Sequence, residues 1–577
     1  MKKYLAYFKP FIWMMCFGFT VKALGAITEL FLPWILSKIV DDIIPTKSIK
    51  TTLLWGGMML LFSALTVIFN ITANRIASKV SAKTTQALRH DLFKKISYLD
   101  AAQIDEISIS SLESRMTVDS YNVHHMANMS QRLGVRAPFL LIGGIIMSFL
   151  LDWRLTLVMV GTLPLIALTI TVISKKGIPL FTALQKSIDD MTAVVRENAS
   201  GVRIIKALRK SEYEKKRFDT VNAEAIRREK KAGITMAFTN PIVTLFLNLG
   251  LTAVIIIGAV LVNKGISSTG KIIAFMSYFT IISNALISIS RIFTAISKGT
   301  AGVKRINAVL EREPTLWTDE TTDDDTIESN GCHISFENVS FSYEKNAHTK
   351  TIDSLSFKLE HGKTLGIIGP TGSGKSTVIS LLLRIYDADE GKIEINGKDI
   401  KTLPTKKIRE SVGVVFQNDF IFADTIRENI SFGRNLSDEQ IAKAIEYSQA
   451  EDYVANLEEK EEYQLDIKGA NLSGGQRQRL LVARALAADP DLLILDDSSS
   501  ALDYKTDSKL RNAINSHFSR TTKIIIAQRV SSIMNSDLIL VLDQGKTVGL
   551  GKHEELIDTC PEYAEIYNLQ IGGGDID

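Results

Sequence analysis

Long runs without a charged side chain constrain this chain most, and they lie in its first half. Residues 51–74, 155–174, 232–263 and 272–290 contain no Asp, Glu, Lys or Arg. The longest such run in the second half is only Thr364–Gly374. A helix needs about 20 mostly apolar residues to cross a bilayer. The first half is therefore predicted to lie in a membrane and the second half in water.

The charges divide in the same way, although the net charge of the 577 residues is only +3. Residues 1–310 contain 38 Lys and Arg against 18 Asp and Glu, whereas residues 311–577 contain 29 against 46. The three cysteines offer no disulfide framework. With the apolar runs, these counts exclude a wholly soluble protein, a disordered one and a disulfide-stapled secreted one.

Six membrane spans are predicted, at about residues 11–41, 52–74, 133–151, 154–174, 233–262 and 271–297. The first is expected to be retained, because no small-residue cleavage site follows it as in a signal peptide. Residues 75–136 contain nine Lys and Arg and residues 175–231 contain fifteen, so both connections are expected in the cytoplasm. This topology predicts a multi-pass protein of the cell membrane with both termini inside. The basic connections are expected to face membrane lipids and not nucleic acid.

The two long connections are predicted to be helices that continue from the spans. Residues 75–98 and 180–231 are rich in Ala, Lys, Arg, Glu and Leu, which favours helix. Their turns are expected near residues 100–112 and 204–218. The acidic stretch that follows contains Asp323, Asp324 and Asp325 and predicts a solvated linker in preference to a metal site.

Beyond the linker, short apolar runs alternate with helical segments, which is typical of an α/β domain with a mostly parallel sheet. The predicted strands are Ile334–Ser342, Leu365–Ile368, Lys392–Ile395, Val412–Phe416, Leu492–Leu495, Lys523–Ile526 and Leu538–Leu542. We therefore expect an all-α membrane domain at residues 1–313, a linker at 314–331 and an α/β nucleotide-binding domain at 332–577.

A phosphate-binding loop follows the second of these strands. Residues 369–376 fit the pattern G-x-x-x-x-G-K-[ST] between a strand and a helical run. Backbone N–H groups and the helix N-terminus hold phosphates in such a loop. Lys375 is expected to reach the β- and γ-phosphates of ATP, and Ser376 to ligate Mg²⁺. The expected ATP-binding residues here are Gly369, Pro370, Thr371, Gly372, Ser373, Gly374, Lys375, Ser376 and Thr377.

Two further motifs accompany the loop. Asp496 ends a buried strand and suits the Mg²⁺ shell of a P-loop nucleotidase. A helix opens at the residues Leu472, Ser473, Gly474, Gly475 and Gln476, which we call the signature motif. Together the motifs resemble those of the ATP-binding-cassette (ABC) transporters. The whole chain, with six spans followed by one cassette, resembles the exporter-type half-transporters of this family. The resemblance implies a six-helix transmembrane domain followed by an α/β P-loop ABC ATPase domain, an ATPase coupled to transport, with ATP and Mg²⁺ as cofactors.

Further site residues are implied by this resemblance alone. Tyr343 resembles the aromatic residue that stacks on adenine, although an ordinary strand tyrosine is the alternative. Gln417 resembles the glutamine that touches Mg²⁺ and senses the membrane domain. The signature motif is implied to act on the ATP of the partner chain. The loop that crosses to the other cassette is implied at Ser500, Ala501, Leu502 and Asp503.

The chain departs from the family pattern at two catalytic positions. The glutamate that polarises the attacking water is replaced by Asp497, and the histidine that contacts the γ-phosphate is replaced by Gln528. The aspartate carboxylate falls back by roughly 1.5 Å, and such misplacement can cost about a hundredfold in rate. Harmless drift is the alternative reading. The stretch at 466–469 also departs from the family pattern.

The two departures predict a partner chain. A homodimer would contain a weakened site twice, whereas a partner with Glu and His would supply one competent site, completed by this chain's signature motif. We therefore expect a subunit of a heterodimeric, multidrug-type exporter. Its cargo is expected to be a hydrophobic or amphipathic small molecule. A homodimeric lipid flippase and an ATP-gated regulatory membrane protein remain as alternatives.

Polar side chains within the spans are candidates for the transport path, because they are costly in a bilayer and often functional. Interhelical hydrogen bonding is the equally weighted alternative. The candidates are Lys22, Glu29, Asn70, Asn248, Asn284 and Arg291.

Overall fold

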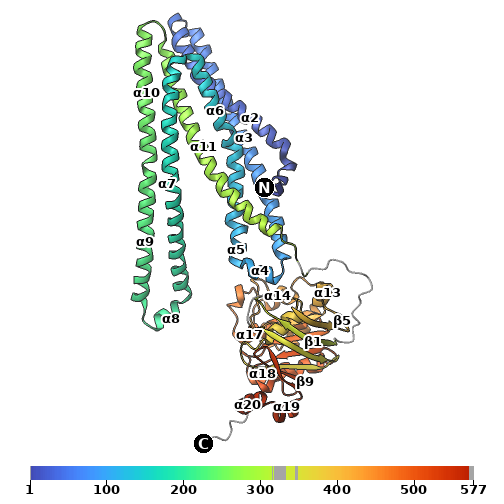
Figure 1. Cartoon of the computed structure of the whole chain (residues 1–577). Helices are drawn as coiled ribbons and strands as arrows, with labels where there is room; N and C mark the ends of the chain where they lie inside the picture. Colours follow the sequence, from blue (N-terminus) through green and yellow to red (C-terminus); the bar gives the residue numbers. More distant parts are fainter. Residues whose placement is uncertain (1, 315, 317–332, 345–348, 571–577) are drawn as a thin grey trace. The chain divides into compact units, whose positions relative to one another are not determined.

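The computed structural model describes residues 2–314, 316, 333–344 and 349–570 (Figure 1). It divides into two compact units, Met1–Ser97 with Ile109–Arg312, and Tyr98–Ser108 with Glu313–Asp577. The turn of the first long connection thus packs with the ATPase half. The predicted linker at 314–331 lies outside the described residues except for residues 314 and 316.

Six helical stretches of the first unit are long and apolar enough to cross a membrane, which confirms the six predicted spans within the described residues. Their bounds are Lys3–Thr46, Ile49–Ser97, Ile109–Leu151, Trp153–Ser200, Ser211–Asn263 and Thr269–Leu310. Helix α3 (Ile49–Ser97) has 49 residues. At 1.5 Å per residue it is about 74 Å long, more than twice the hydrocarbon thickness of a bilayer. The helices therefore continue well past the bilayer, as the composition of the long connections predicts.

Two groups of helices make up this unit. Helices α2 (Ile12–Lys38), α6 (Ser120–Leu151) and α11 (Thr269–Leu310) pack with α3, whereas α7 (Trp153–Ser200) runs beside α9 (Ser211–Ala237) and α10 (Thr239–Asn263) (Figure 1). Small residues allow close approach, as apolar helix packing in lipid requires. An added Cβ at Gly144 would lie 2.6 Å from the Ile282 side chain.

Short helices form the turns of the long connections. Helices α4 (Ala101–Ile107) and α5 (Ile109–Ser114) form the first turn, as predicted. Asp100 and Gln103 cap α4 reciprocally. The second turn contains α8 (Val202–Ala207) and ends where α9 begins at Ser211. It therefore lies a few residues earlier than predicted, because Gly201 ends α7.

The ATPase unit is built on two sheets. One has six strands in the order β10-β9-β3-β8-β7-β6 and the other has four in the order β2-β1-β4-β5. The strands are β1 Ile334–Phe341, β2 Ile352–Leu359, β3 Thr364–Ile368, β4 Glu390–Ile395, β5 Lys398–Asp399, β6 Val412–Val415, β7 Leu492–Asp496, β8 Thr522–Ile526, β9 Leu538–Asp543 and β10 Lys546–Gly551. All neighbours in the larger sheet are parallel except β10 with β9, which confirms the mostly parallel core.

Every predicted strand is present, with ends shifted by one or two residues. Strands β2, β5 and β10 were not predicted. The sequence of β2 alternates polar with apolar residues and is interrupted by Asp353 and Ser354, and β10 contains Gly549 and Gly551. The continuous apolar runs that identify parallel strands buried on both faces do not occur in such strands.

Helices surround the sheets. Some of them pack together in a hydrophobic cluster that is separate from the cluster between the two sheets. The elements that position the site are α12 (Lys375–Leu382), α17 (Gly474–Leu486) and α18 (Tyr504–His517). Other helices are α13 Thr405–Glu410, α14 Ile426–Ser431, α15 Asp438–Tyr447, α16 Glu451–Val454, α19 His553–Thr559 and α20 Pro561–Gln570. Tyr563 of α20 is fully buried against β9 and its neighbours, so the last helix is fixed to the sheet.

Candidate ATP site

A cavity of about 300 Å³ gathers most of the predicted ATP-binding positions. Residues from six separate segments line it: Tyr343, Thr351, Thr371, Gly372, Gly374, Lys375, Ser376, Thr377, Gln417, Asp496, Asp497, Ile526 and Gln528. Parallel strands β3, β7 and β8 end at one edge of the sheet, so their C-terminal residues meet there, as expected for a ligand site in a parallel sheet. Thr351 and Ile526 were not predicted as site residues.

The phosphate-binding loop takes a conformation that requires glycine. Gly369, Gly372 and Gly374 have φ values of +155°, +86° and +96°. A Cβ at Gly369 would collide with the carbonyl oxygen of Leu542, and one at Gly374 would lie 2.9 Å from the Thr351 oxygen. The chain thus turns tightly from β3 into α12, which places the N-terminus of α12 where an anion would bind.

Lys375 curls back over this loop. Its Nζ donates to the carbonyl oxygens of Gly369 at 2.8 Å and Pro370 at 2.7 Å. Burial lowers the pKa of the Lys375 ammonium, against the opposing charges of Asp496 and Asp497. The ammonium therefore lies at the loop, where a phosphate chain would bind.

The expected Mg²⁺ ligands are already assembled. Ser376 Oγ donates to Asp496 Oδ2 at 2.7 Å, and the Gln417 side chain lines the same cavity. Burial, followed by the charge of Asp497, raises the pKa of the Asp496 carboxyl. Hydroxyl, amide and carboxylate oxygens are the hard ligands that Mg²⁺ shares with phosphates, so this donor set fits the ion.

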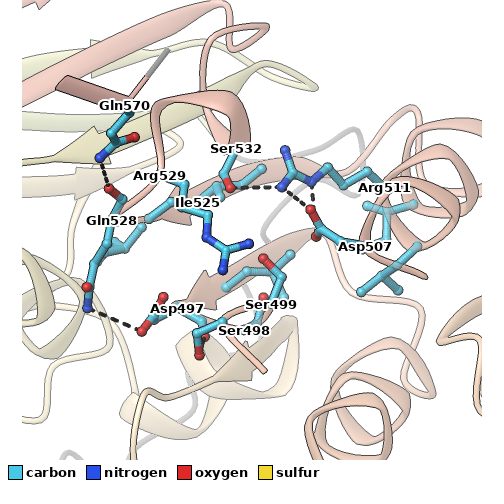
Figure 2. Close-up of a pocket in the computed structure, with 16 residues that line it drawn as sticks. Asp497, Ser498, Ser499, Asp507, Arg511, Ile525, Gln528, Arg529, Ser532 and Gln570 are labelled. Atoms are coloured by element: carbon cyan, nitrogen blue, oxygen red, sulfur yellow. Dashed lines mark hydrogen bonds and ion pairs between the residues drawn. The ribbon is translucent and has the colours of Figure 1, made fainter. Parts of the chain in front are cut away.

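The two departures from the family pattern contact each other. Gln528 Nε2 donates to Asp497 Oδ2 at 3.3 Å (Figure 2). Asp497 has a left-handed backbone, with φ of +51°. Burial raises the pKa of its carboxyl, and the charges of Arg529 and Lys375 oppose this. The residue that should polarise water is therefore already hydrogen-bonded to a neutral amide.

Gln570 was missed by sequence reasoning and holds the backbone around Gln528. Its Nε2 donates to the Gln528 carbonyl oxygen at 2.7 Å (Figure 2). Its Oε1 accepts from the Val530 N–H at 2.8 Å. From α18, Arg511 donates to the Ser531 oxygen at 2.8 Å. Gln570, Gln528 and Arg511 line, together with Asp497, a cavity of about 400 Å³. No sequence motif marks Gln570, which is 42 residues from Gln528 in the chain.

The signature motif lies outside the lining of the ATP cavity. Ser473 caps α17: its Oγ accepts from the Gln476 N–H at 3.3 Å, and the Gln476 side chain accepts from the Ser473 N–H at 2.8 Å. Gln478 then holds the Ser500–Asp503 loop, accepting from the Ala501 N–H at 2.8 Å. The capped helix start and this loop form one rigid surface, separate from the chain's own phosphate loop.

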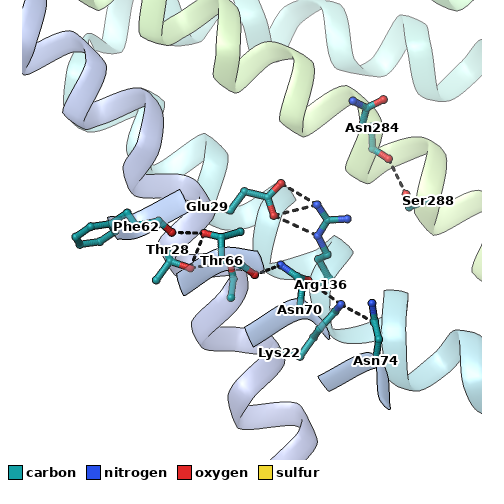
Figure 3. A network of polar contacts seen from close by, with 11 residues as sticks. Lys22, Thr28, Glu29, Phe62, Thr66, Asn70, Asn74, Arg136, Asn284 and Ser288 are labelled. Atoms are coloured by element: carbon teal, nitrogen blue, oxygen red, sulfur yellow. Dashed lines mark hydrogen bonds and ion pairs between the residues drawn. The ribbon is translucent and has the colours of Figure 1, made fainter. Parts of the chain in front are cut away.

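A polar network joins three spans of the membrane unit (Figure 3). The buried Lys22 donates to the side-chain oxygens of Asn70 at 2.8 Å and Asn74 at 2.9 Å. Arg136 forms a two-pronged ion pair with Glu29, with closest atoms at 2.8 Å. The predicted path residues Lys22, Glu29 and Asn70 are therefore brought together.

Two residues of this region were not predicted, and three predicted ones lie apart from the network. Arg132 donates to Asn74 at 3.2 Å, and Arg136 pairs with Glu29. Both arginines lie at the edge of the weakest predicted span, which explains why they were not singled out. Asn248, Asn284 and Arg291 are exposed on α10 and α11.

Comparisons with known proteins agree over nearly the whole chain. Residues 15–286 match the ABC transporter transmembrane region, and residues 352–500 match the ABC transporter model. The uncharacterized ABC transporter ATP-binding protein YfiB of Bacillus subtilis is 32% identical, covering 99% of each chain. The ATP-dependent lipid A-core flippase of Vibrio vulnificus is 30% identical, covering 86% of this chain and 85% of its own. A bacterial Atm1-family ABC exporter with ATP bound has the same fold, with a TM-score of 0.82, 23% identity, and coverage of 98% and 99%.

Proposed function

Because this chain belongs to the ABC transporter family, as a half-transporter whose membrane domain is fused to its ATPase domain, we propose that it is one subunit of a heterodimeric exporter. Its ATPase is coupled to transport across the membrane. In the proposed complex, its own ATP site binds nucleotide and hydrolyses it weakly. The partner chain supplies Glu and His at the positions of Asp497 and Gln528.

The contact between Asp497 and Gln528 carries this proposal. The amide of Gln528 donates to the Asp497 carboxylate at 3.3 Å. The two replaced side chains therefore use their hydrogen-bonding groups on each other. An amide carries no positive charge toward a γ-phosphate, and the shorter carboxylate reaches less far toward an attacking water. Mispositioning of this size can lower a rate by about a hundredfold. Both effects weaken hydrolysis while leaving the phosphate loop and the Mg²⁺ donors able to bind.

The intact signature motif supports a role for this chain in the partner's site. Its capping box pre-forms the N-terminus of α17, where two free N–H groups and the helix dipole favour an anion. In the proposed dimer these groups meet the γ-phosphate bound to the partner's loop. A chain that only bound ATP as a switch would have no use for this surface, which argues against the ATP-gated regulatory alternative.

In the bound state, Ser376, Gln417 and Asp496 would hold Mg²⁺, which neutralises charge on the phosphates. Lys375 would turn from the loop carbonyls to the phosphates. Tyr343 would offer its exposed ring to the adenine. Ser500–Asp503 would face the partner cassette, beside the signature motif that it already contacts through Gln478.

The cargo that we propose is a hydrophobic or amphipathic molecule, moved across the cell membrane with the ATPase unit and both termini on the cytoplasmic side. Two observations support an amphipathic molecule. The similar Vibrio vulnificus protein is a lipid A-core flippase, and the spans contain the Lys22 and Arg136 network at partly buried positions. Because that relative is a lipid flippase, we retain lipid flipping, by a homodimer of this chain, as the second candidate function.

Co-purification tests the assembly. The chain is tagged at its C-terminus, extracted from native membranes in mild detergent, and the bound chains are identified by mass spectrometry. We expect a second half-transporter whose strand Asp is followed by Glu and whose sequence has His at the position of Gln528. Recovery of only further copies of this chain would contradict the heterodimer and favour the homodimeric flippase.

A further inference from the structure

Tyr343, in the wall of the ATP cavity, belongs to a cluster of three aromatic rings with Phe341 and Tyr386. Tyr343 lines the cavity and is 51% exposed. Its ring meets Phe341 edge-on at 4.9 Å and Tyr386 edge-on at 5.2 Å between centroids. Its hydroxyl lies 3.3 Å from the Thr377 hydroxyl at the start of α12. Tyr343 is thus half open to solvent at the cavity while its ring packs against Tyr386.

The other end of Tyr386 reaches helix α4. Its hydroxyl donates to Asp105 Oδ2 at 2.6 Å. Both residues belong to the same compact unit, although 281 positions separate them in the sequence. Burial, together with the hydrogen bond and the charge of Asp105, raises the pKa of Tyr386, so the hydroxyl remains a donor.

Other contacts also connect α4 and its N-terminal cap with this unit. Gln103 Nε2 donates to the Glu313 oxygen at 2.9 Å, close to where the chain leaves the membrane unit. The charge of Asp100 acts on Arg409. Of these contacts, the Tyr386 hydroxyl is the one whose ring also touches a wall of the ATP cavity.

We infer that Tyr386 is a positioning residue. It couples the binding of a base on the Tyr343 ring to the strength with which helix α4 is held to the rest of the ATPase unit. A base stacked on Tyr343 restricts that ring, the edge contact restricts Tyr386, and the hydroxyl then holds Asp105 more firmly. Phosphates without a base leave the exposed part of the Tyr343 ring unoccupied, so in this route they have a weaker effect than a nucleotide. By thermodynamic reciprocity, an attached α4 favours base binding to the same degree.

The role of this link in transport rests on the proposed function, in which ATP binding in this unit is coupled to transport through the spans. The contacts themselves lie within one chain. They can therefore be measured on the full-length chain whether or not a partner is present.

Amide hydrogen exchange of the full-length chain in lipid nanodiscs tests the link. Exchange of residues 98–108 is compared without ligand, with MgATP, and with Mg-tripolyphosphate, which carries the phosphates but no base. The concentrations are chosen so that both ligands protect residues 369–377 equally. We expect MgATP to slow exchange of residues 98–108 at least about fivefold, and tripolyphosphate to leave it within about twofold of the unliganded rate.

Tyr386→Phe removes only the hydroxyl and keeps the ring. With the MgATP concentration readjusted so that residues 369–377 are protected as in the unmodified chain, this variant should abolish the effect of MgATP on residues 98–108, and Asp105→Leu should do the same from the other side. Tyr504→Phe, which alters an exposed tyrosine elsewhere in the ATPase unit, should respond like the unmodified chain.

Equal protection of residues 98–108 by tripolyphosphate and MgATP would overturn the inference, and so would a normal response in Tyr386→Phe. Either result would leave the ATP site and the proposed heterodimer untouched. Failure of MgATP to protect residues 369–377 would instead contradict the assigned ATP site, and would overturn the link with it.

Discussion

At the scale of single residues, the chemistry of this ATP site depends on what surrounds Asp497. The carboxylate is partly buried beside Asp496 and accepts a hydrogen bond from Gln528, whose backbone carbonyl in turn accepts from Gln570. The sequence alone identifies Asp497 and Gln528, because each follows a recognisable strand. It does not identify Gln570, since a contact across 42 residues from a C-terminal helix leaves no local pattern.

Restoring the usual pair should restore hydrolysis at this site. In the complex with the partner's catalytic Glu replaced by Gln, Asp497→Glu combined with Gln528→His is expected to raise ATP turnover about tenfold to a hundredfold. The longer carboxylate reaches the water and the imidazole can carry charge. Steady-state phosphate release measures the effect, and the partner-disabled complex without these changes is the control. An unchanged rate would show that these two residues do not limit this site.

At the scale of elements, hydrophobic runs and capping motifs predict most of the fold. Four of the six spans follow from charge-free runs, and the first and third follow from apolar stretches that contain a few charged residues. Strands β2 and β10 and the exact second turn were missed, because a half-buried strand or a helix end depends on neighbours that are distant in sequence. The Arg136–Glu29 pair was missed for the same reason, since it joins residues 107 positions apart.

The capping box of α17 is expected to contribute both to stability and to ATP turnover, whereas the capping box of α15 contributes only to stability. Ser473→Ala removes the cap and should lower the free energy of unfolding by about 1 kcal/mol. Ser437→Ala, in the identical capping box of α15, should do the same and is the matched control. Only Ser473→Ala should lower ATP turnover of the complex, by tenfold or more, because it alters the surface offered to the partner's site. Equal turnover in both variants would contradict that role.

The ion pair between α2 and α6 is expected to stabilise the membrane unit. Glu29→Gln leaves the half-buried Arg136 without its carboxylate, and should lower stability by about 1–3 kcal/mol. Asp42→Asn breaks the exposed pair with Lys38, which lies 2.7 Å away, and should cost at most about 0.5 kcal/mol. Thermal unfolding in nanodiscs measures both.

If Glu29→Gln unfolds like Asp42→Asn but reduces transport, the pair serves the transport path instead of stability. That result would favour the functional reading of the polar network over interhelical hydrogen bonding. Loss of stability with transport rates preserved per folded molecule would favour the structural reading.

At the scale of the whole molecule, the near-neutral net charge is the sum of a basic half suited to a membrane and an acidic half suited to water. The basic half is a bundle of six long apolar helices, and the acidic half is an ATPase unit on a parallel sheet. The family and the ATP site follow from the sequence motifs. Cargo and partner do not, because the first depends on the shape of a path between helices and the second on another chain.

The central claim is that this chain hydrolyses ATP well only through a partner. The most direct test measures ATP turnover of the full-length chain alone in nanodiscs and of the same chain after assembly with the co-purified half-transporter. We predict that the chain alone binds MgATP but turns it over at least about tenfold more slowly than the complex, consistent with a misplaced carboxylate. Equally fast turnover by the chain alone would contradict the account.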